Sequence, residues 1–445
     1  MLATPNNRRI GLEQEFFLVD EDGALSHRAD EFLALCHEAA RETGRDPEGF
    51  APECARSMVE ISTPPVHSIT GLSHEYGTSL GLALDAGREL GLRLYPLATY
   101  PLPVQPALRD ESHYQIQARA VGRKRFANAG RCAGVHLHLE VAKDTIDSRT
   151  GVSQRAPEAA REELLSLYNL ATALDPALIA LTRSCPFYEG VADGTAARTA
   201  LYRGDPVLAP HGLYTQLQQV GGLLPYAGST RELVEHQLTR YQTWLEALDQ
   251  AGVERRLFFE TGGGLLTASS WNPVRLNRHG TIELRGIDSN YPKKVLETCS
   301  LIKSAADRVR HERLAVVSRE GLHVIEATGD TLNVPDFGYL DGTLFHAAMR
   351  GGIESPEVVS YLDSVVRFAN SPSGGENGPE TRKASGHYRT TEAEILQRFD
   401  LPASSLVREE RGLGLVREVC DEFEKQIASF KRETAEATKM GVDED

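Results

Sequence analysis

Three short segments of this chain each carry a pair of charged or metal-binding side chains two residues apart, with apolar residues between and around them. A two-residue period is typical of a β-strand, in which residues i and i+2 point to the same face about 7 Å apart. Each segment is therefore predicted to aim its pair at one side of a sheet. Burying so much charge without partners is costly, and cations and a phosphorylated ligand would offset that cost. The pairs are Glu13 with Glu15, His136 with His138, and Glu283 with Arg285.

The first two pairs favour a metal site. An isolated Glu-x-Glu pattern is more often a solvated strand face, but Glu13 and Glu15 stand among Leu12, Phe16 and Phe17, as in a central strand. Carboxylate oxygens suit Mg²⁺ or Mn²⁺. A single histidine is more often a core residue bonded to the backbone, whereas two on one strand face indicate a site. Such a strand also occurs in zinc and copper sites. No further Cys or His has a suitable spacing, so zinc is the second choice.

The third pair favours a phosphate group. A surface ion pair is the alternative for Glu283 and Arg285, and such pairs are common and contribute little. Their apolar neighbours instead predict a central strand. A guanidinium beside a metal-binding carboxylate can neutralise phosphoryl charge. Arg275 and Arg278, a few residues earlier, add positive potential.

The composition excludes several classes of partner. The chain has 445 residues, a net charge of −15 and no long basic run, so we expect no nucleic-acid partner. The N-terminus has no apolar signal core, and no apolar run approaches the length of a membrane helix, so we expect no membrane contact. The six cysteines are scattered. They favour buried thiols in a reducing cytosol over a disulfide set or a zinc site, and a cytoplasmic location is expected.

The chain is predicted to have three parts. A catalytic domain covers residues 1–370, a flexible loop rich in Gly, Ser and Pro covers 371–388, and a helical extension covers 389–445. The segment 184–230 lacks clear periodicity, but its aromatic residues indicate an ordered binding loop. A strand pair is expected at 254–260 and 264–270. Helices are expected near residues 30–43, 68–90, 157–183, 231–250, 291–318 and 405–439.

Five motifs follow one another along the chain. They are Gly11–Asp20, Met58–Pro65, Ala133–Leu139, Ser184–Gly190 and Gly280–Asp288. In this order they resemble the motifs of the bacterial carboxylate–amine ligases, also called type-2 glutamate–cysteine ligases, a family similar in fold to glutamine synthetase. The matched motifs span residues 9–288. Two motifs depart from the family pattern, since its Asn-Ser-Pro reads Ser-Cys-Pro at 184–186 and its Trp-Asp-x-Arg-Pro reads Trp-Asn-Pro-Val-Arg at 271–275.

The resemblance implies an α+β fold with a curved, mainly antiparallel sheet. Its concave face would hold ATP and divalent metal ions, Mg²⁺ or Mn²⁺, and its helices would pack on the convex side. The first strand's two glutamates would bind two different ions. By the same resemblance the metal ligands are Glu13, Glu15, Glu60, His136 and Glu283, and the nucleotide contacts are His138, Arg285 and Arg275.

The resemblance also implies residues for the substrate and for catalysis. Arg198 aligns with a family arginine after a one-residue gap and is expected to bind a substrate carboxylate. Thr63, three residues after Glu60, is expected to contact the substrate. Arg285 and Glu60 are expected to act in catalysis.

The function that the resemblance implies is an ATP- and Mg²⁺-dependent ligase. It would activate the γ-carboxylate of glutamate as an acyl phosphate and join it to an amine such as cysteine, another amino acid or a polyamine. A phosphotransferase of the same architecture, a nucleotide or metabolite sensor without turnover, and more distantly a zinc hydrolase are the alternatives. The partners would be small-molecule substrates, and a homo-oligomer, with a dimer favoured, is expected.

Overall fold

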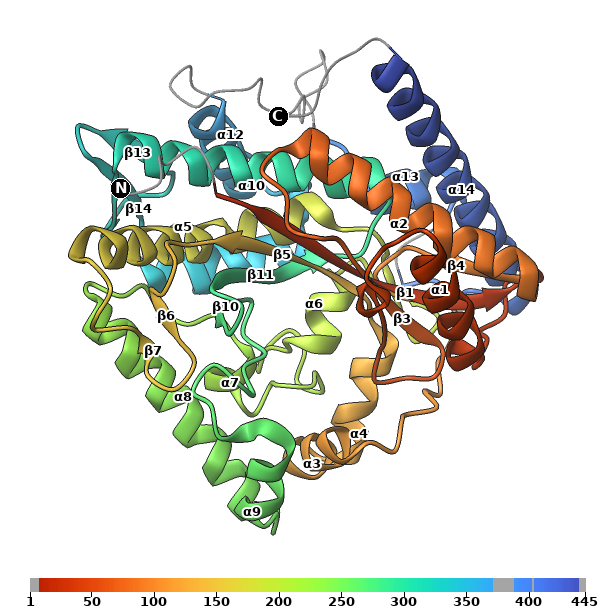
Figure 1. Cartoon of the computed structure of the whole chain (residues 1–445), viewed down its shortest axis with the longest axis horizontal. Helices are drawn as coiled ribbons and strands as arrows, with labels where there is room; N and C mark the ends of the chain where they lie inside the picture. Colours follow the sequence, from red (N-terminus) through yellow and green to blue (C-terminus); the bar gives the residue numbers. More distant parts are fainter. Residues whose placement is uncertain (1–7, 371–387, 402–403, 440–445) are drawn as a thin grey trace.

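A seven-stranded sheet forms the centre of the protein in a computed structural model that describes residues 8–370, 388–401 and 404–439 (Figure 1). Every strand pair in this sheet is antiparallel. The predicted α+β class with a mainly antiparallel sheet is therefore confirmed. The strand order is β10 (Val274–Asn277), β11 (Thr281–Asp288), β5 (Gly134–Glu140), β1 (Ile10–Asp20), β3 (Met58–Ser62) and β2 (Phe50–Pro52), and β4 (Leu92–Tyr95) pairs with β1.

One face of the sheet is apolar and is covered by helices. In β1, Leu12, Phe16 and Leu18 are buried in the main hydrophobic core, whereas Glu13 and Glu15 point to the opposite face. This alternation follows from the two-residue period of a strand. The helices that form this core with the sheet are α1 (Ala29–Glu42), α2 (Ile69–Leu90), α5 (Glu158–Thr182), α10 (Pro292–Glu312) and α12 (Pro356–Ala369).

Helix α5 is the longest apolar element of this layer. By length and composition it could cross a membrane, although no such run was expected from the sequence, and 89% of its most apolar window is buried inside the protein. Leu167, Leu170 and Leu174 belong to the main core. Burial against the sheet and its neighbouring helices therefore accounts for its composition.

The opposite face of the sheet is partly enclosed by helices and loops, which lie below the sheet in Figure 1. They are α3 (Ser112–Val121), α4 (Arg123–Phe126), α6 (Ala197–Tyr202), α7 (Gln218–Gly221), α8 (Thr230–Gln250) and α9 (Arg255–Phe258). Segment 184–230, predicted as an irregular loop, thus contains α6 and α7, and it also holds the short hairpin β8 (Phe187–Tyr188) and β9 (Val191–Ala192).

The remaining elements complete the fold, and several of them also contribute side chains to the main core. Strands β12 (Ala315–Arg319), β14 (Thr331–Pro335) and β13 (Glu326–Thr328) form a small separate sheet. The others are η2 (Pro47–Gly49), η3 (Ala127–Arg131), β6 (Ile146–Asp147), β7 (Gly151–Val152), η4 (Phe259–Gly263), η5 (Tyr339–Leu344), α11 (Phe345–Arg350), η6 (Gly352–Glu354), α13 (Thr391–Arg398) and α14 (Glu409–Lys439).

Two predicted elements were wrong. The strand pair at 254–260 and 264–270 is instead helix α9 followed by the turn η4. Phe258 packs against Tyr241 of α8, and the Tyr241 hydroxyl donates to the Gly263 carbonyl at 2.7 Å, so packing overrides the strand preference of these aromatics. Helix α10 ends at Glu312 rather than near 318, because Arg313 adopts a left-handed conformation (φ 51°) and the chain turns into β12.

The C-terminal part contains two described helices, α13 and α14. Phe423 and Ile427 of α14 belong to the main core, so this helix packs on the same unit as the sheet. The predicted loop at 371–388 lies outside the described residues except for its last residue. All six cysteines are buried and free, which confirms the expectation of buried thiols.

Candidate functional site

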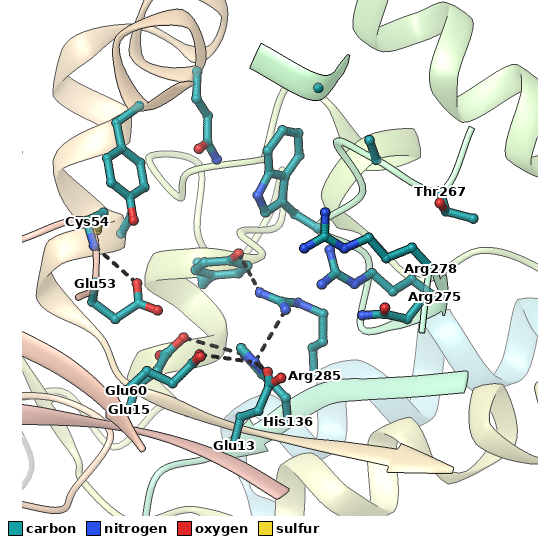
Figure 2. Close-up of a pocket in the computed structure, with 18 of the residues that line it drawn as sticks. Glu13, Glu15, Glu53, Cys54, Glu60, His136, Thr267, Arg275, Arg278 and Arg285 are labelled. Atoms are coloured by element: carbon teal, nitrogen blue, oxygen red, sulfur yellow. Dashed lines mark hydrogen bonds and ion pairs between the residues drawn. The ribbon is translucent and has the colours of Figure 1, made fainter. Parts of the chain in front are cut away.

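The strand register places the three polar pairs on one wall. Glu13 lies directly opposite His136, and His138 directly opposite Glu283. On the other side of β1, Glu15 lies directly opposite Glu60 of β3. Residues paired in this way have side chains on the same face of a sheet. The structure thus brings together all five side chains for which metal binding was predicted. Figure 2 shows four of them, Glu13, Glu15, Glu60 and His136.

Three overlapping groups on this wall could each hold a metal ion. Within each group, one ligand atom per residue lies within 4.8 Å of the others. The His136 Nδ1 lies 3.0 Å from Glu13 Oε2, and the His138 Nε2 lies 3.2 Å from Glu13 Oε1. The His136 Nε2 is buried and lies 3.5 Å from Glu15 Oε1. Nitrogen and oxygen atoms converging in this way fit divalent cations. The groups are Glu13, Glu60 and His136; Glu13, His138 and Glu283; and Glu15, Glu53 and Glu60.

Without bound cations, burial and mutual repulsion disfavour the ionised form of several carboxylates of the wall. Burial, with the charge of Glu15, raises the pKa of Glu53 to about 8. Burial, with the charges of Glu13 and Glu53, raises the pKa of Glu60 well above its ordinary value. Burial also acts to raise the pKa of Glu13, but hydrogen bonds from the two histidines of β5 outweigh it and lower the pKa. Bound divalent cations would stabilise the ionised form of all three.

Glu283 is fully buried and joins the metal-capable wall to two arginines. Arg275 Nε and Arg285 Nη1 each donate to a different oxygen of Glu283 at 2.6 Å, and Asn277 donates as well. Burial opposes ionisation of Glu283, but the charges of Arg275 and Arg285 lower its pKa well below the ordinary value. Arg285 Nη1 is also 3.4 Å from His136 Nδ1. Positive charge is thereby held next to the candidate metal groups.

The wall borders a cavity of about 450 Å³. Figure 2 shows Glu13, Glu15, Glu53 and Glu60 at one end and Arg278 and Arg275 at the other. Trp271 also lines the cavity. Its ring stacks on that of Tyr214 at a centroid distance of 5.5 Å and packs edge to face against that of Trp244 at 4.8 Å. The Tyr, Phe, Trp, Gln and Asn side chains that line the cavity are Tyr114, Gln117, Phe126, Tyr202, Trp271 and Asn277.

A second cavity, of about 230 Å³, adjoins the first. Glu13 and His279 line both cavities. His138 lines the second, and its Nδ1 lies 2.9 Å from the Thr281 hydroxyl. Thr63 also lines it, and its hydroxyl accepts from the Leu12 N–H at 3.1 Å. The candidate metal groups that contain Glu13 therefore lie at the border between the two cavities.

Arg198, for which a substrate contact was predicted, is not among the residues that line either of these cavities. It is 4% exposed, and its Nη2 donates to the backbone carbonyl of Arg285 at 3.0 Å. The structure thus places it behind Arg285. Arg278 does line the large cavity, and in the described part of the chain no carboxylate lies within ion-pair distance of it.

Glu53, Tyr114 and Trp271 line the cavity but were not predicted from the sequence as site residues. Glu53 follows β2, a strand of three residues that is too short to show alternation. Its one signal is the pairing of β2 with β3, which places Ala51 opposite Glu60. Tyr114 and Trp271 come from a helix and a loop that are far apart in sequence. Only tertiary structure shows that they share a cavity.

Comparisons with known proteins agree with one another. The family model described as "Glutamate-cysteine ligase family 2 (GCS2)" matches residues 9–319. A glutamate–cysteine ligase of Halobacterium salinarum is 25% identical over 299 residues, which cover 65% of this chain and 66% of that protein. A protein of Rhodococcus jostii is 29% identical over 193 residues, which cover 42% of this chain and 45% of that protein. The chain thus spans roughly half to two thirds of the length of these relatives.

A solved structure extends the similarity to the fold. The crystal structure of glutamate–cysteine ligase from Francisella tularensis in complex with AMP has a TM-score of 0.50 with this chain, at 13% sequence identity. The superposition covers 99% of this chain and 95% of that one. At this level of identity the likeness concerns the fold alone.

Proposed function

The chain belongs to glutamate–cysteine ligase family 2, and from this premise we propose that it is an ATP- and Mg²⁺-dependent ligase. It would join the γ-carboxylate of glutamate to an amine such as cysteine. The observation that carries the proposal is the strand wall. Its three metal-capable groups are linked by Glu13 and Glu60, each of which belongs to two groups, and they lie next to two arginines held by Glu283. Phosphoryl transfer from a nucleotide needs this combination of cation ligands and fixed positive charge.

The proposed cation ligands are the members of the three groups. Glu15, Glu53 and Glu60 would hold one ion, and Glu13 would contribute to ions on the side of the histidines. The buried Nε2 atoms of His136 and His138, which lie next to carboxylate oxygens of Glu15 and Glu13, make these residues suitable ligands or phosphate contacts. When bound, Mg²⁺ or Mn²⁺ would screen the triphosphate and polarise the transferred phosphoryl group.

The proposed reaction has two steps. A carboxylate oxygen of the acid attacks the γ-phosphorus of ATP, the bond to the bridging oxygen breaks, and ADP leaves. The amine then attacks the acyl carbon, the C–N bond forms, the amine loses a proton and phosphate leaves. Arg285 and Arg275, aligned by Glu283, would neutralise charge on the transferred group, and Glu60 would act through the ion that it helps to hold. The protein thus mainly positions and neutralises.

The two cavities could bind different substrates. We assign the nucleoside end of ATP to the smaller cavity, where His138, Thr281 and Thr63 provide polar contacts. The acid and the amine would then occupy the larger cavity, which has the aromatic wall. Arg278 is the proposed contact for the acid's α-carboxylate, because its guanidinium lines this cavity without a carboxylate partner among the described side chains.

A screen with glutamate, Mg²⁺, ATP and a panel of amines tests this function. We expect amine-dependent release of ADP and a product whose mass equals glutamate plus the amine minus water. Stoichiometric AMP would contradict phosphoryl transfer from the γ-position. A stable phosphorylated acid formed without any amine would instead identify a phosphotransferase, and tight ATP binding without turnover would identify a sensor.

A further inference from the structure

The strand that carries Arg285 is irregular at that residue. Leu284 of β11 lies opposite Leu137, and Ile287 lies opposite Val135, so two residues of β11 face one residue of β5. This is a β-bulge, a device that often re-aims a side chain beside an active site. The backbone groups of Arg285 face the other neighbouring strand, β10, where Pro273, directly before that strand, has a carbonyl but no N–H. The Arg285 N–H and carbonyl therefore need two different partners.

Arg198 provides one of these partners. The Arg285 N–H donates to the Pro273 carbonyl at 2.7 Å, and the Arg285 carbonyl accepts from Arg198 Nη2 at 3.0 Å. Arg198 lies on α6, and its guanidinium carbon is 5.6 Å from the ring centroid of Tyr202. The Tyr202 hydroxyl in turn is 3.4 Å from Arg285 Nη2. Arg198 thus contacts the backbone of Arg285 directly and its side chain through Tyr202.

Gly134 leaves the space that Arg198 occupies. A Cβ at this position would lie 2.1 Å from Arg198 Nη2 and 2.6 Å from its guanidinium carbon, so the guanidinium rests on the backbone of β5. The Gly134 N–H donates to Glu15 Oε2 at 2.6 Å. The Arg198 guanidinium therefore packs between the backbone of β5 and the bulge of β11. The β5 backbone at this point also bonds Glu15, a predicted metal ligand.

The surroundings of Arg198 do not suit a direct substrate contact. The guanidinium is buried and lies outside the large cavity. Among the side chains that the structure describes, no carboxylate is within 4.0 Å of it, and the nearby small cavity of about 20 Å³ is too small for an amino acid. A buried cation that bonds a strand carbonyl is instead well placed to fix the backbone.

We propose that Arg198 is a positioning residue, which fixes the bulge of β11 and thereby aims the Arg285 guanidinium at the transferred phosphoryl group. This rests on the proposed function in one respect, namely that Arg285 faces the phosphoryl group. Misplacing a catalytic group by about 1 Å can reduce a rate by about 100-fold. A direct role in binding the acid would affect a different quantity, the KM for that acid.

Arg198→Lys and Arg198→Met test the proposal through coupling to Arg285. We expect kcat to fall about tenfold or more and the Kd for Mg·ATP to rise about threefold, with the KM for the acid unchanged within about twofold. In an Arg285→Lys background, the Arg198 substitutions should change kcat and Kd by less than about twofold. Equal losses in both backgrounds, or a rise confined to the KM for the acid, would overturn the proposal.

A matched control and a second variant separate positioning from loss of folding. Arg183 is also buried and donates to backbone carbonyls, those of Met349 and Arg350, away from the cavity. Arg183→Lys should lower the melting temperature without the selective change in kcat. Gly134→Ala keeps Arg198 but forces its guanidinium to move, and should reproduce the kcat and Kd changes. Wild-type kcat and Kd in Gly134→Ala would overturn the proposal.

The test also distinguishes failure of the inference from failure of the proposed function. If no amine in the panel supports turnover by the wild-type protein, the ligase function fails. Calorimetry of Mg·ATP binding still measures the coupling between Arg198 and Arg285 in that case. If the wild-type protein is an active ligase and the coupling is absent, the inference fails and the function stands.

Discussion

The two sides of the large cavity are built by different means. The strand wall takes its charged residues from β1, β3, β5 and β11, and the register of these strands fixes which side chains meet. The facing wall takes Tyr114, Tyr202 and Trp271 from separate helices and loops, and packing of aromatic rings holds it. The two walls can therefore vary independently. Under the proposed function, the facing wall would change with the substrates while the strand wall would keep the proposed phosphoryl-transfer chemistry.

The largest effect is expected on the strand wall. Glu13→Gln keeps the shape of a residue shared by two metal-capable groups but removes its charge. We expect kcat to fall about 100-fold or more at saturating Mg²⁺, measured by ADP release, with a melting temperature close to that of the wild type. Glu326→Gln, on the exposed strand β13, is the control. Near-normal turnover of Glu13→Gln would mean that the strand wall does not bind the catalytic cations.

Glu283→Gln sharpens the same test, because Glu283 is both a predicted ligand and the buried partner of two arginines. Without its charge, Arg275 and Arg285 would lose their common carboxylate. We expect a similar loss of kcat and, unlike for Glu13→Gln, a loss of stability of about 3 kcal/mol in urea unfolding. Equal stability of the two variants would show that the ion pairs of Glu283 contribute little to the fold.

A smaller and more selective effect is expected at the cavity end that carries Arg278. Arg278→Gln should raise the KM for the acid about tenfold and leave the KM for ATP within about twofold, because a charge-assisted hydrogen bond to one ligand is lost. Initial rates with each substrate varied in turn measure both constants. If the KM for ATP rises as much as that for the acid, Arg278 contacts the nucleotide and the proposed division between the cavities is wrong.

The facing wall should show the smallest catalytic effect. Trp271→Leu leaves the strand wall untouched but reshapes the cavity. We expect the relative kcat/KM values for a panel of amines to change about fivefold while the KM for ATP stays constant, since differences in pocket shape discriminate weakly. An unchanged order of amines, with a uniform loss for all of them, would show that this wall is only structural.

The smallest expected effect is thermodynamic. The pKa of Glu53 is raised to about 8 in the folded, metal-free protein by burial and by Glu15, so between about pH 5 and about pH 8 the folded state keeps a proton that the unfolded state has lost. Stability of the metal-free protein should therefore fall as the pH rises through this range. Mg²⁺ should raise the melting temperature by a few degrees more at about pH 8 than at about pH 6, because its ligands must be ionised.

Differential scanning fluorimetry with Mg²⁺ or with EDTA measures this effect. Glu53→Gln should remove part of the pH dependence and reduce the Mg²⁺ stabilisation at high pH, and Glu60, whose pKa is also raised, should account for much of the remainder. An equal Mg²⁺ increment at both pH values would show that Glu53 does not change its protonation when the ion binds.

The strand wall could be predicted from the sequence because a strand has a short, regular period. Glu13, His136 and Glu283 each stand in an alternating segment, and the family resemblance supplied the order of the segments. The long helices followed from apolar periodicity for the same reason, with errors mainly at their ends. These features depend on residues that are close together in sequence.

The rest of the site depends on contacts between distant residues. Glu53 follows a strand too short to show a pattern. The position of Trp271 depends on the ring of Trp244 in α8 and the ring of Tyr214 in segment 184–230. The segment around Phe258 has a strand-like composition, but its packing on α8 makes it helical. Arg198 was recognised as notable from its alignment, yet only the structure shows that its guanidinium bonds the backbone of Arg285.

The packing of α14 has a consequence for the order of events in the cell. Phe423 of α14 lies against Phe16 of β1 at a centroid distance of 5.5 Å, and Arg93 of β4 donates to Asp421 and Glu424, each at 2.7 Å. Phe16 and Phe423 are about four hundred residues apart, so β1 leaves the ribosome long before its cover is made. Part of the apolar face of the strand that bears Glu13 and Glu15 therefore stays uncovered until nearly all of this chain has been translated.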